Sequence, residues 1–207
     1  SQGEAFTAVD TNGSILSNAM VSFDTRATGI AHDWSEAFGR EQLYEITGHT
    51  AHPMFTLFKL LWLRHNQPEI WEAARHFYCF EDLLHWRLGL EPAISYPMAG
   101  RTMLFNVREH CWDRTLLETA GLSPEQLARP VPSGAVVGTI PSGIAGEMGL
   151  RSGVSVVTGG HDQPCGALGA GVLRSGRAMY GMGTVECICP AFEKPVFRHE
   201  LFKNNLC

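Results

Sequence analysis

The sequence predicts a mixed α/β fold, and two features carry this prediction. A β-branched run over residues 154–158 ends at Gly159-Gly160, and His161-Asp162-Gln163 and a series of small residues spaced as in a tightly packed helix follow it. Earlier in the chain, segments with the apolar periodicity of helices alternate with short strand-like runs. A strand that ends in a glycine turn before a helix presents its first polar side chains at the carboxyl end, where α/β proteins bind ligands. We therefore expect Asp162 and Gln163 to face a cleft.

The remaining elements follow from apolar spacing and from Gly and Pro breakers. Two apolar runs, 5–9 and 15–23, flank the turn signal Asp10-Thr11-Asn12-Gly13 and predict a β-hairpin. Helices are expected over 34–46 with a break near Gly39, 53–66, 68–75, 82–90, 112–120, after Ser123, and 142–150. Strands are expected over 76–80, 136–140 and 154–158, a second Gly-rich turn at 181–186 lies within a strand-like run, and 96–101 is expected to be irregular.

Composition excludes several classes of protein. The 207 residues carry a net charge of −5 without a basic stripe, which argues against a nucleic-acid partner. No apolar run reaches membrane-spanning length and no signal-peptide pattern opens the chain, so we expect no membrane partner. The six cysteines lack the spacing of a disulfide framework and are expected to be free thiols of a cytoplasmic protein.

Two further site classes find little support in the sequence. His49 and His52 are three residues apart, but no third ligand follows at metal-binding spacing, so no metal-ligating residue is assigned. The glycines after residue 165 do not spell G-x-G-x-x-G, which leaves a nicotinamide-dependent oxidoreductase as a weak third hypothesis. The chain also begins without Met and closes without an evident final element, so we expect it to be part of a longer polypeptide.

Five motifs occur in an order that resembles the FGGY carbohydrate kinases, of the xylulokinase and glycerol kinase type, over nearly the whole chain. They are Asp24-Thr25-Arg26, Thr47-Gly48 with Lys59-Leu60-Leu61-Trp62, Arg101 to Asn106 with Trp112-Asp113, Gly159-Gly160-His161-Asp162-Gln163, and Gly183-Thr184. Three positions differ from the usual pattern, and at the first of them Ser22 stands where Trp is usual. Ser95 stands where many relatives have Asp, and Val185 stands where Ser or Gly is common, and both differences bear on the acceptor more than on the reaction class.

The resemblance implies a ribonuclease-H-like fold of the actin, hexokinase and Hsp70 group. Residues 1–172 would form most of the substrate-binding domain, and residues 173–207 would form the opening hairpin of the nucleotide-binding domain. The Asp-x-Gly-Thr turn that opens the family pattern and the adenine pocket have no counterpart in these residues. For this reason we expect the 207 residues alone to be inactive.

The resemblance also implies the chemistry, which is ATP-dependent phosphorylation of a sugar or polyol with Mg²⁺. Asp162 would be the general base that takes the proton of the acceptor hydroxyl. From the local sequence alone, an N-cap of the following helix is the stronger interpretation of Asp162. His161 is expected to shape the pocket rather than to act as a base.

The other candidate site residues each have a structural alternative. Gln2, Glu4, Tyr96 and Gln163 would contact the sugar; the alternatives are a frayed terminus for the first two, a packed aromatic anchor for Tyr96 and a solvent-facing first helical turn for Gln163. Gly183 and Thr184 would contact phosphate, or would form an ordinary hairpin turn. A catalytically silent sugar-binding relative or a truncated gene product is the second hypothesis, and homo-oligomer formation is left open.

Overall fold

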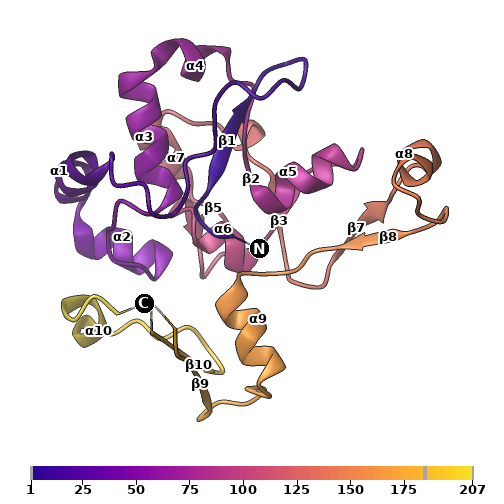
Figure 1. Cartoon of the computed structure of the whole chain (residues 1–207). Helices are drawn as coiled ribbons and strands as arrows, with labels where there is room; N and C mark the ends of the chain where they lie inside the picture. Colours follow the sequence, from indigo (N-terminus) through magenta and orange to yellow (C-terminus); the bar gives the residue numbers. More distant parts are fainter. Residues whose placement is uncertain (1, 184–185, 207) are drawn as a thin grey trace.

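The computed structural model describes residues 2–183 and 186–206 and shows a helix-rich body from which two parts project (Figure 1). The helices are α1 (Thr28–Phe38), α2 (Arg40–Thr47), α3 (Thr56–Asn66), α4 (Pro68–Ala73), α5 (Phe80–Arg87), α6 (Tyr96–Gly100), α7 (Arg114–Ala120), the 3-10 turn η1 (Pro124–Gln126), α8 (Ser142–Glu147), α9 (Asp162–Gly169) and α10 (His199–Lys203). The strands are β1 (Phe6–Val9), β2 (His76–Cys79), β3 (Ala93–Ser95), β4 (Phe105–Asn106), β5 (Cys111–Trp112), β6 (Arg129–Val131), β7 (Val136–Thr139), β8 (Ser155–Val157), β9 (Ala178–Gly181) and β10 (Cys187–Pro190).

The main core surrounds α3. Four of its apolar side chains are fully buried: Leu57, Phe58, Leu60 and Leu63. They pack with residues of β1, β2, α6 and α7 in one hydrophobic cluster. Because burial of each large apolar side chain stabilises a fold by about 1.5–3 kcal/mol, α3 is the element that holds the body together.

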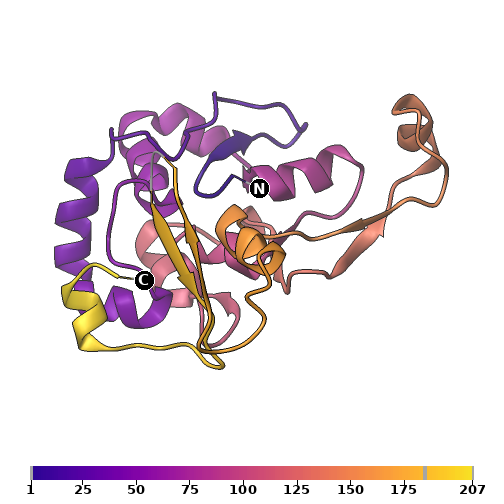
Figure 2. The same ribbon diagram turned by 60° about the horizontal axis from the view of Figure 1, so that its bottom comes forward.

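The strands of the described residues form five separate two-stranded sheets. Only β3 and β6 pair in parallel, and the pairs β1–β2, β4–β5, β7–β8 and β9–β10 are antiparallel. The β7–β8 pair and α8 extend away from the body, and α9 leads to the β9–β10 hairpin at its lower side (Figures 1 and 2). The body therefore lies to one side of the β8–α9 junction and the hairpin to the other.

Most of the predicted elements are present, with two corrections. The helix of residues 34–46 is indeed divided at Gly39, whose φ of 101° an L side chain rarely adopts. Of residues 96–101, which were expected to be irregular, Tyr96–Gly100 form α6, because Pro97 occupies its first turn, where a missing N–H costs nothing. The predicted hairpin is reduced to single bridges from β1 to Ile15 and Met20, and the ladder partner of β1 is the distant β2.

Candidate active site

Three segments far apart in the sequence meet at the edge of the body. Gly3 lies against the imidazole of His161, so closely that a Cβ atom on Gly3 would stand 2.8 Å from the ring carbon Cδ2. The same atom would stand 3.5 Å from Cγ of Arg101. One contact region therefore includes the segment before β1, the residue after α6 and the β8–α9 turn. We call this region the candidate active site.

Glu4 has an unusual backbone in this region. Its φ is +63°, and the N–H of Ala5 donates to the carbonyl of Gly3 at 2.7 Å, which is the hydrogen-bond pattern of a γ-turn centred on Glu4. The hydroxyl of Thr56 fixes the turn by donating to the Glu4 carbonyl at 2.9 Å. Strained backbone of this kind concentrates at functional sites. The frayed terminus considered for this segment does not describe Glu4, which is buried.

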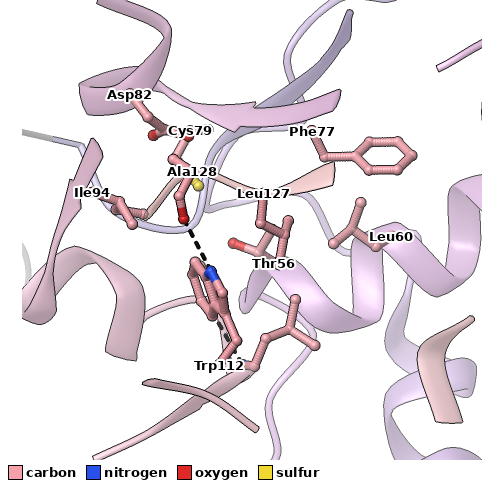
Figure 3. Close-up of a pocket in the computed structure, with 11 residues that line it drawn as sticks. Thr56, Leu60, Phe77, Cys79, Asp82, Ile94, Trp112, Leu127 and Ala128 are labelled. Carbon is pink, nitrogen blue, oxygen red and sulfur yellow. Dashed lines mark hydrogen bonds between the residues drawn. The ribbon is translucent and has the colours of Figure 1, made fainter. Parts of the chain in front are cut away.

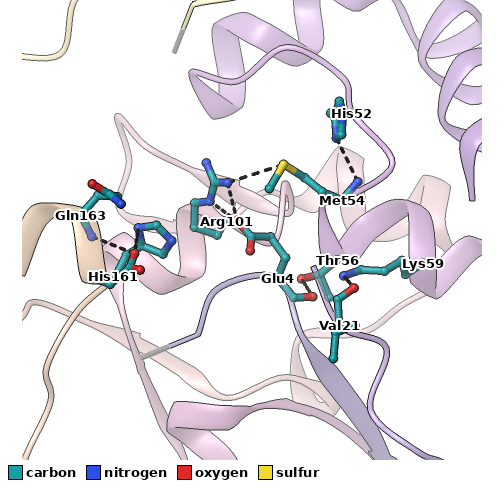
Figure 4. A network of polar contacts seen from close by, with 10 residues as sticks. Glu4, Val21, His52, Met54, Thr56, Lys59, Arg101, His161 and Gln163 are labelled. Atoms are coloured by element: carbon teal, nitrogen blue, oxygen red, sulfur yellow. Dashed lines mark hydrogen bonds and ion pairs between the residues drawn. The ribbon is translucent and has the colours of Figure 1, made fainter. Parts of the chain in front are cut away.

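An ion pair joins Glu4 to Arg101 (Figure 4). Both Nε and Nη2 of Arg101 contact Oε1 of Glu4, and the two side chains are only 4% and 18% exposed. The guanidinium also lies 4.7 Å from the ring centre of Phe55. A buried carboxylate is stable only when paired, so Arg101 compensates the charge of Glu4 and fixes its orientation.

The positive charge of Arg101 acts on two histidines, His49 and His161, and contributes to lowering the pKa of each. Burial, followed by the positive charge of Arg101, lowers the pKa of His49 to about 3. Burial lowers the pKa of His161 as well, with Arg101 acting in the same direction and Asp162 against it. Both imidazoles are therefore held in their neutral forms more strongly than an exposed histidine is.

The turn between β8 and α9 is anchored on several sides. The hydroxyl of Thr158 donates to the carbonyl of Pro132 at 2.8 Å and accepts from the N–H of Ala135 at 3.0 Å. A Cβ atom on Gly160 would lie 3.4 Å from the hydroxyl of Ser133 and 3.8 Å from Pro97. Gly160 thus passes close to its neighbours, whereas a Cβ atom on Gly159 would meet no atom within 4 Å.

Asp162 is placed where a ligand can reach it. It is the first residue of α9, and its side chain is 69% exposed. Its Oδ1 lies 3.2 Å from Nδ1 of His161 and accepts from the N–H of Gln163 at 2.8 Å. The N-cap position belongs to His161, so the local interpretation of Asp162 as the N-cap is wrong. A carboxylate in the first helical turn is still favoured by the helix dipole.

The remaining predicted sugar contacts are distributed around this region. Gln163 lies near the hairpin, because a Cβ atom on Gly181 would stand 3.5 Å from its side-chain oxygen. Gln2 is exposed. Tyr96 begins α6 and stacks on His110 at 4.8 Å between ring centres, which matches the packed anchor considered for it. A direct sugar contact of these residues stays a prediction.

Gly183, the first predicted phosphate contact, lies two residues after the end of β9. Gly183 is exposed there. Thr184 lies outside the residues that the structure describes, so its role also stays a prediction. Within residues 2–183 and 186–206, there is no group of three or more His, Cys, Asp or Glu side chains that could hold a metal ion.

Two of the sequence motifs contact each other beside the candidate active site. Lys59 is fully buried and donates from Nζ to the carbonyl of Val21 at 3.1 Å (Figure 4). Arg26 forms an ion pair with Asp24 at 2.8 Å and lies 4.6 Å from the ring centre of Trp62. The Asp24-Thr25-Arg26 and Lys59-to-Trp62 motifs are therefore a single packed unit that supports the loop after β1.

A small cavity of about 10 Å³ lies inside the body and is separate from the site (Figure 3). Its lining includes Asp82, Cys79 and Trp112, and the indole N–H of Trp112 donates to the carbonyl of Ala128 at 2.9 Å. Burial raises the pKa of Asp82 well above its usual range. A void of this size holds about one water molecule, which excludes it as a sugar site.

The sequence interpretation gave no site role to two charged residues that are central here, Arg101 and Glu81. Each is a charge in a largely apolar segment, and charged residues in such segments are buried only when they are paired. That signal could have marked them as members of internal ion pairs or hydrogen-bond networks. Arg101 pairs with Glu4, 97 residues earlier in the chain, and Glu81 accepts a hydrogen bond from Gly159, 78 residues later. No local sequence pattern spans such separations.

Comparison with known proteins gives a consistent result. The profile described as "FGGY family of carbohydrate kinases, N-terminal domain" matches residues 1–169. A xylulose kinase from Staphylococcus epidermidis is 34% identical over 179 residues, covering 85% of this chain and 34% of its own length. A gluconokinase from Bacillus licheniformis is 28% identical over 188 residues, 91% of this chain and 37% of its own length.

Solved structures of the same group share the fold. A gluconate kinase from Lactobacillus acidophilus superposes with a TM-score of 0.84 at 24% identity, over 90% of this chain and 38% of that chain. A glycerol kinase from Plasmodium falciparum, solved with ADP, superposes with a TM-score of 0.82 at 22% identity, over 90% of this chain and 38% of that chain. The chain thus spans less than two fifths of the length of these relatives. The superpositions confirm the predicted ribonuclease-H-like fold class. With a match over residues 1–169, this chain belongs to the FGGY family of carbohydrate kinases.

Proposed function

We propose that the whole protein, meaning the natural polypeptide that contains these 207 residues, transfers the γ-phosphoryl group of ATP to a hydroxyl of a sugar or polyol. The observation that supports this most is the position of Asp162. It stands exposed at the start of α9, beside the buried Glu4–Arg101 pair, within the segment that matches the family. The relatives that resemble this chain include a xylulose kinase and a gluconokinase.

Asp162 is the residue that we assign as general base. As the acceptor oxygen attacks phosphorus, the carboxylate of Asp162 takes the hydroxyl proton. Oδ1 of Asp162 lies 3.2 Å from Nδ1 of His161 and accepts a hydrogen bond from the backbone N–H of Gln163 at 2.8 Å. Phosphoryl transfer depends mainly on positioning, so a carboxylate fixed by two contacts suits the task.

We assign sugar recognition to Gln2, Glu4, Tyr96 and Gln163, and phosphate contact to Gly183 and Thr184. Mg²⁺, when bound, would screen the charge of the phosphates. We also propose that residues 1–172 and 173–207 belong to different domains. The match that ends at residue 169 is in line with that division.

The cytoplasm is the location that we propose, because ATP is available there and five cysteines of the described chain are free. The described residues contain no helix long and apolar enough to cross a membrane. A second candidate function is a silent sugar-binding relative. It would keep the sugar contacts and lack phosphoryl transfer.

The test is a substrate screen of the whole protein. Pentoses, hexoses, polyols and gluconate are supplied with ATP and Mg²⁺, and formation of ADP and of the phosphorylated sugar is measured. We expect phosphorylation of at least one of these compounds. Sugar binding by calorimetry without ADP formation would instead support the silent relative.

A further inference from the structure

The carboxylate of Glu81 joins the end of β3, directly before α6, to the β8–α9 turn of the candidate active site. Glu81 lies in the first turn of α5 and is 7% exposed. One of its oxygens, Oε2, accepts from the backbone N–H of Ser95 at 2.9 Å and from the Ser95 hydroxyl at 2.7 Å. The other, Oε1, accepts from the backbone N–H of Gly159 at 3.0 Å. Three donors from two distant segments thus converge on one buried anion.

These hydrogen bonds are not required for the helix to which Glu81 belongs. The N-terminus of α5 is capped by Asp82, whose Oδ2 accepts from the N–H of Cys79 at 3.0 Å. Glu81 reaches outward instead, to the end of β3 and to the turn after β8. Hydrogen bonds to an ionised acceptor are about twice as strong as neutral ones, so the three hydrogen bonds to the Glu81 carboxylate connect the two segments strongly.

The two segments that Glu81 joins carry the proposed chemistry. Ser95 directly precedes Tyr96, and Gly159 is three residues before Asp162. Pro97 in the first turn of α6 also approaches Gly160 in the β8–α9 turn. Ser95 fits this arrangement because it supplies a hydroxyl donor, whereas a carboxylate at that position would face the Glu81 carboxylate as a like charge.

We propose that Glu81 is a positioning residue, which acts through Ser95 and Gly159 to hold the β3–α6 junction and the β8–α9 turn in one fixed arrangement. This inference rests on the proposed function for its kinetic consequence. Its structural content, the tether from Glu81 to Gly159, can be tested independently of activity.

The experiment compares E81Q, E81D and D82N with the wild type in the whole protein. An amide at position 81 can present an N–H group to a donor, and an aspartate is one methylene too short to reach both segments. D82N is the matched control, since it changes the adjacent buried carboxyl on the same helix and keeps an oxygen that can cap Cys79. E81D retains the negative charge, and it replaces E81Q as the test variant if E81Q does not fold.

Hydrogen exchange of the peptide over residues 158–163 is the first readout. We expect E81Q and E81D to speed exchange at Gly159 by about tenfold or more, and D82N to leave it unchanged. The second readout is kinetic. With the sugar found in the screen, kcat of E81Q should fall by roughly 10- to 100-fold while KM for ATP stays within a few-fold.

The outcomes distinguish the proposed kinase function from the tether formed by Glu81. If the wild type phosphorylates none of the compounds, the proposed function fails and the exchange data still decide whether the tether exists. Unchanged exchange in E81Q and E81D, or equal acceleration in D82N, overturns the tether. Faster exchange with an unchanged kcat overturns the positioning role.

Discussion

At the scale of single residues, the site is organised by buried charges. Glu4 is paired with Arg101, Glu81 accepts three hydrogen bonds, and the ammonium group of Lys59 is held by two backbone carbonyls. Like Glu81 and unlike Glu4, Lys59 has no ion-pair partner among the described salt bridges. Its burial therefore has a measurable effect on stability.

Lys59 should make the stability of the fold depend on pH. Burial lowers the pKa of Lys59 from 10.5 to about 8, while the charge of Glu4 opposes this in part. Between these values the unfolded chain binds the proton more strongly, so the free energy of unfolding should rise with pH, by roughly 3 kcal/mol across the window. Urea unfolding of the wild type and of K59M at pH 7.5 and pH 10 measures this. A difference between the two proteins that does not change with pH would contradict the assignment.

At the scale of elements, helix ends explain much of what the sequence revealed. Gly39 divides α1 from α2, Gly121 ends α7, and Ser123 begins η1, and each position carried a recognisable breaker or capping residue. The β3 and β6 strands had no such signal, because three-residue strands carry too little periodicity. Their parallel pairing joins residues 36 positions apart, which only tertiary packing specifies.

Helix α7 offers a direct test of capping in this fold. The side chain of Asp113 accepts from the N–H of Leu116 at 3.1 Å and so satisfies one of the free donors of the first turn. D113A should lower the free energy of unfolding by about 1 kcal/mol, and D113N by much less, since Asn caps as well as Asp. Urea denaturation of the three proteins gives the comparison. Equal stability of D113A and the wild type would show that the cap contributes nothing.

At the scale of the whole molecule, the family could be recognised from motif order, but the connections within the site could not. The Asp162 turn was visible as a strand, two glycines and a polar pair. The Glu4–Arg101 and Glu81–Gly159 contacts depend on the path of the chain between them, which includes α3, α5 and α6. The interpretation of Asp162 as an N-cap was wrong because the helix begins one residue earlier than the local pattern suggested.

The described surface also carries exposed apolar side chains on the projecting parts. They are Val136, Met148, Leu150 and Val157 on the β7–β8 and α8 projection and Leu168, Leu173, Tyr180 and Ile188 around α9 and the hairpin. Apolar groups beside open strand edges favour association. We expect the 207-residue chain to self-associate, as measured by light scattering, and V136T with I188T to reduce this. A monodisperse monomer would contradict the expectation.

The 207-residue chain spans less than two fifths of its kinase relatives, so catalysis is best tested in the whole protein. The central claim is that Asp162 is the general base of a sugar kinase. The D162N substitution preserves shape and one acceptor oxygen but cannot take the hydroxyl proton.

Steady-state kinetics and a sugar-binding titration on D162N test this claim most directly, with the sugar that the screen identifies. We predict that sugar affinity stays within a few-fold of the wild type while kcat falls by roughly 10²–10⁴-fold. A kcat within a few-fold of the wild type would contradict the claim and remove Asp162 from the mechanism.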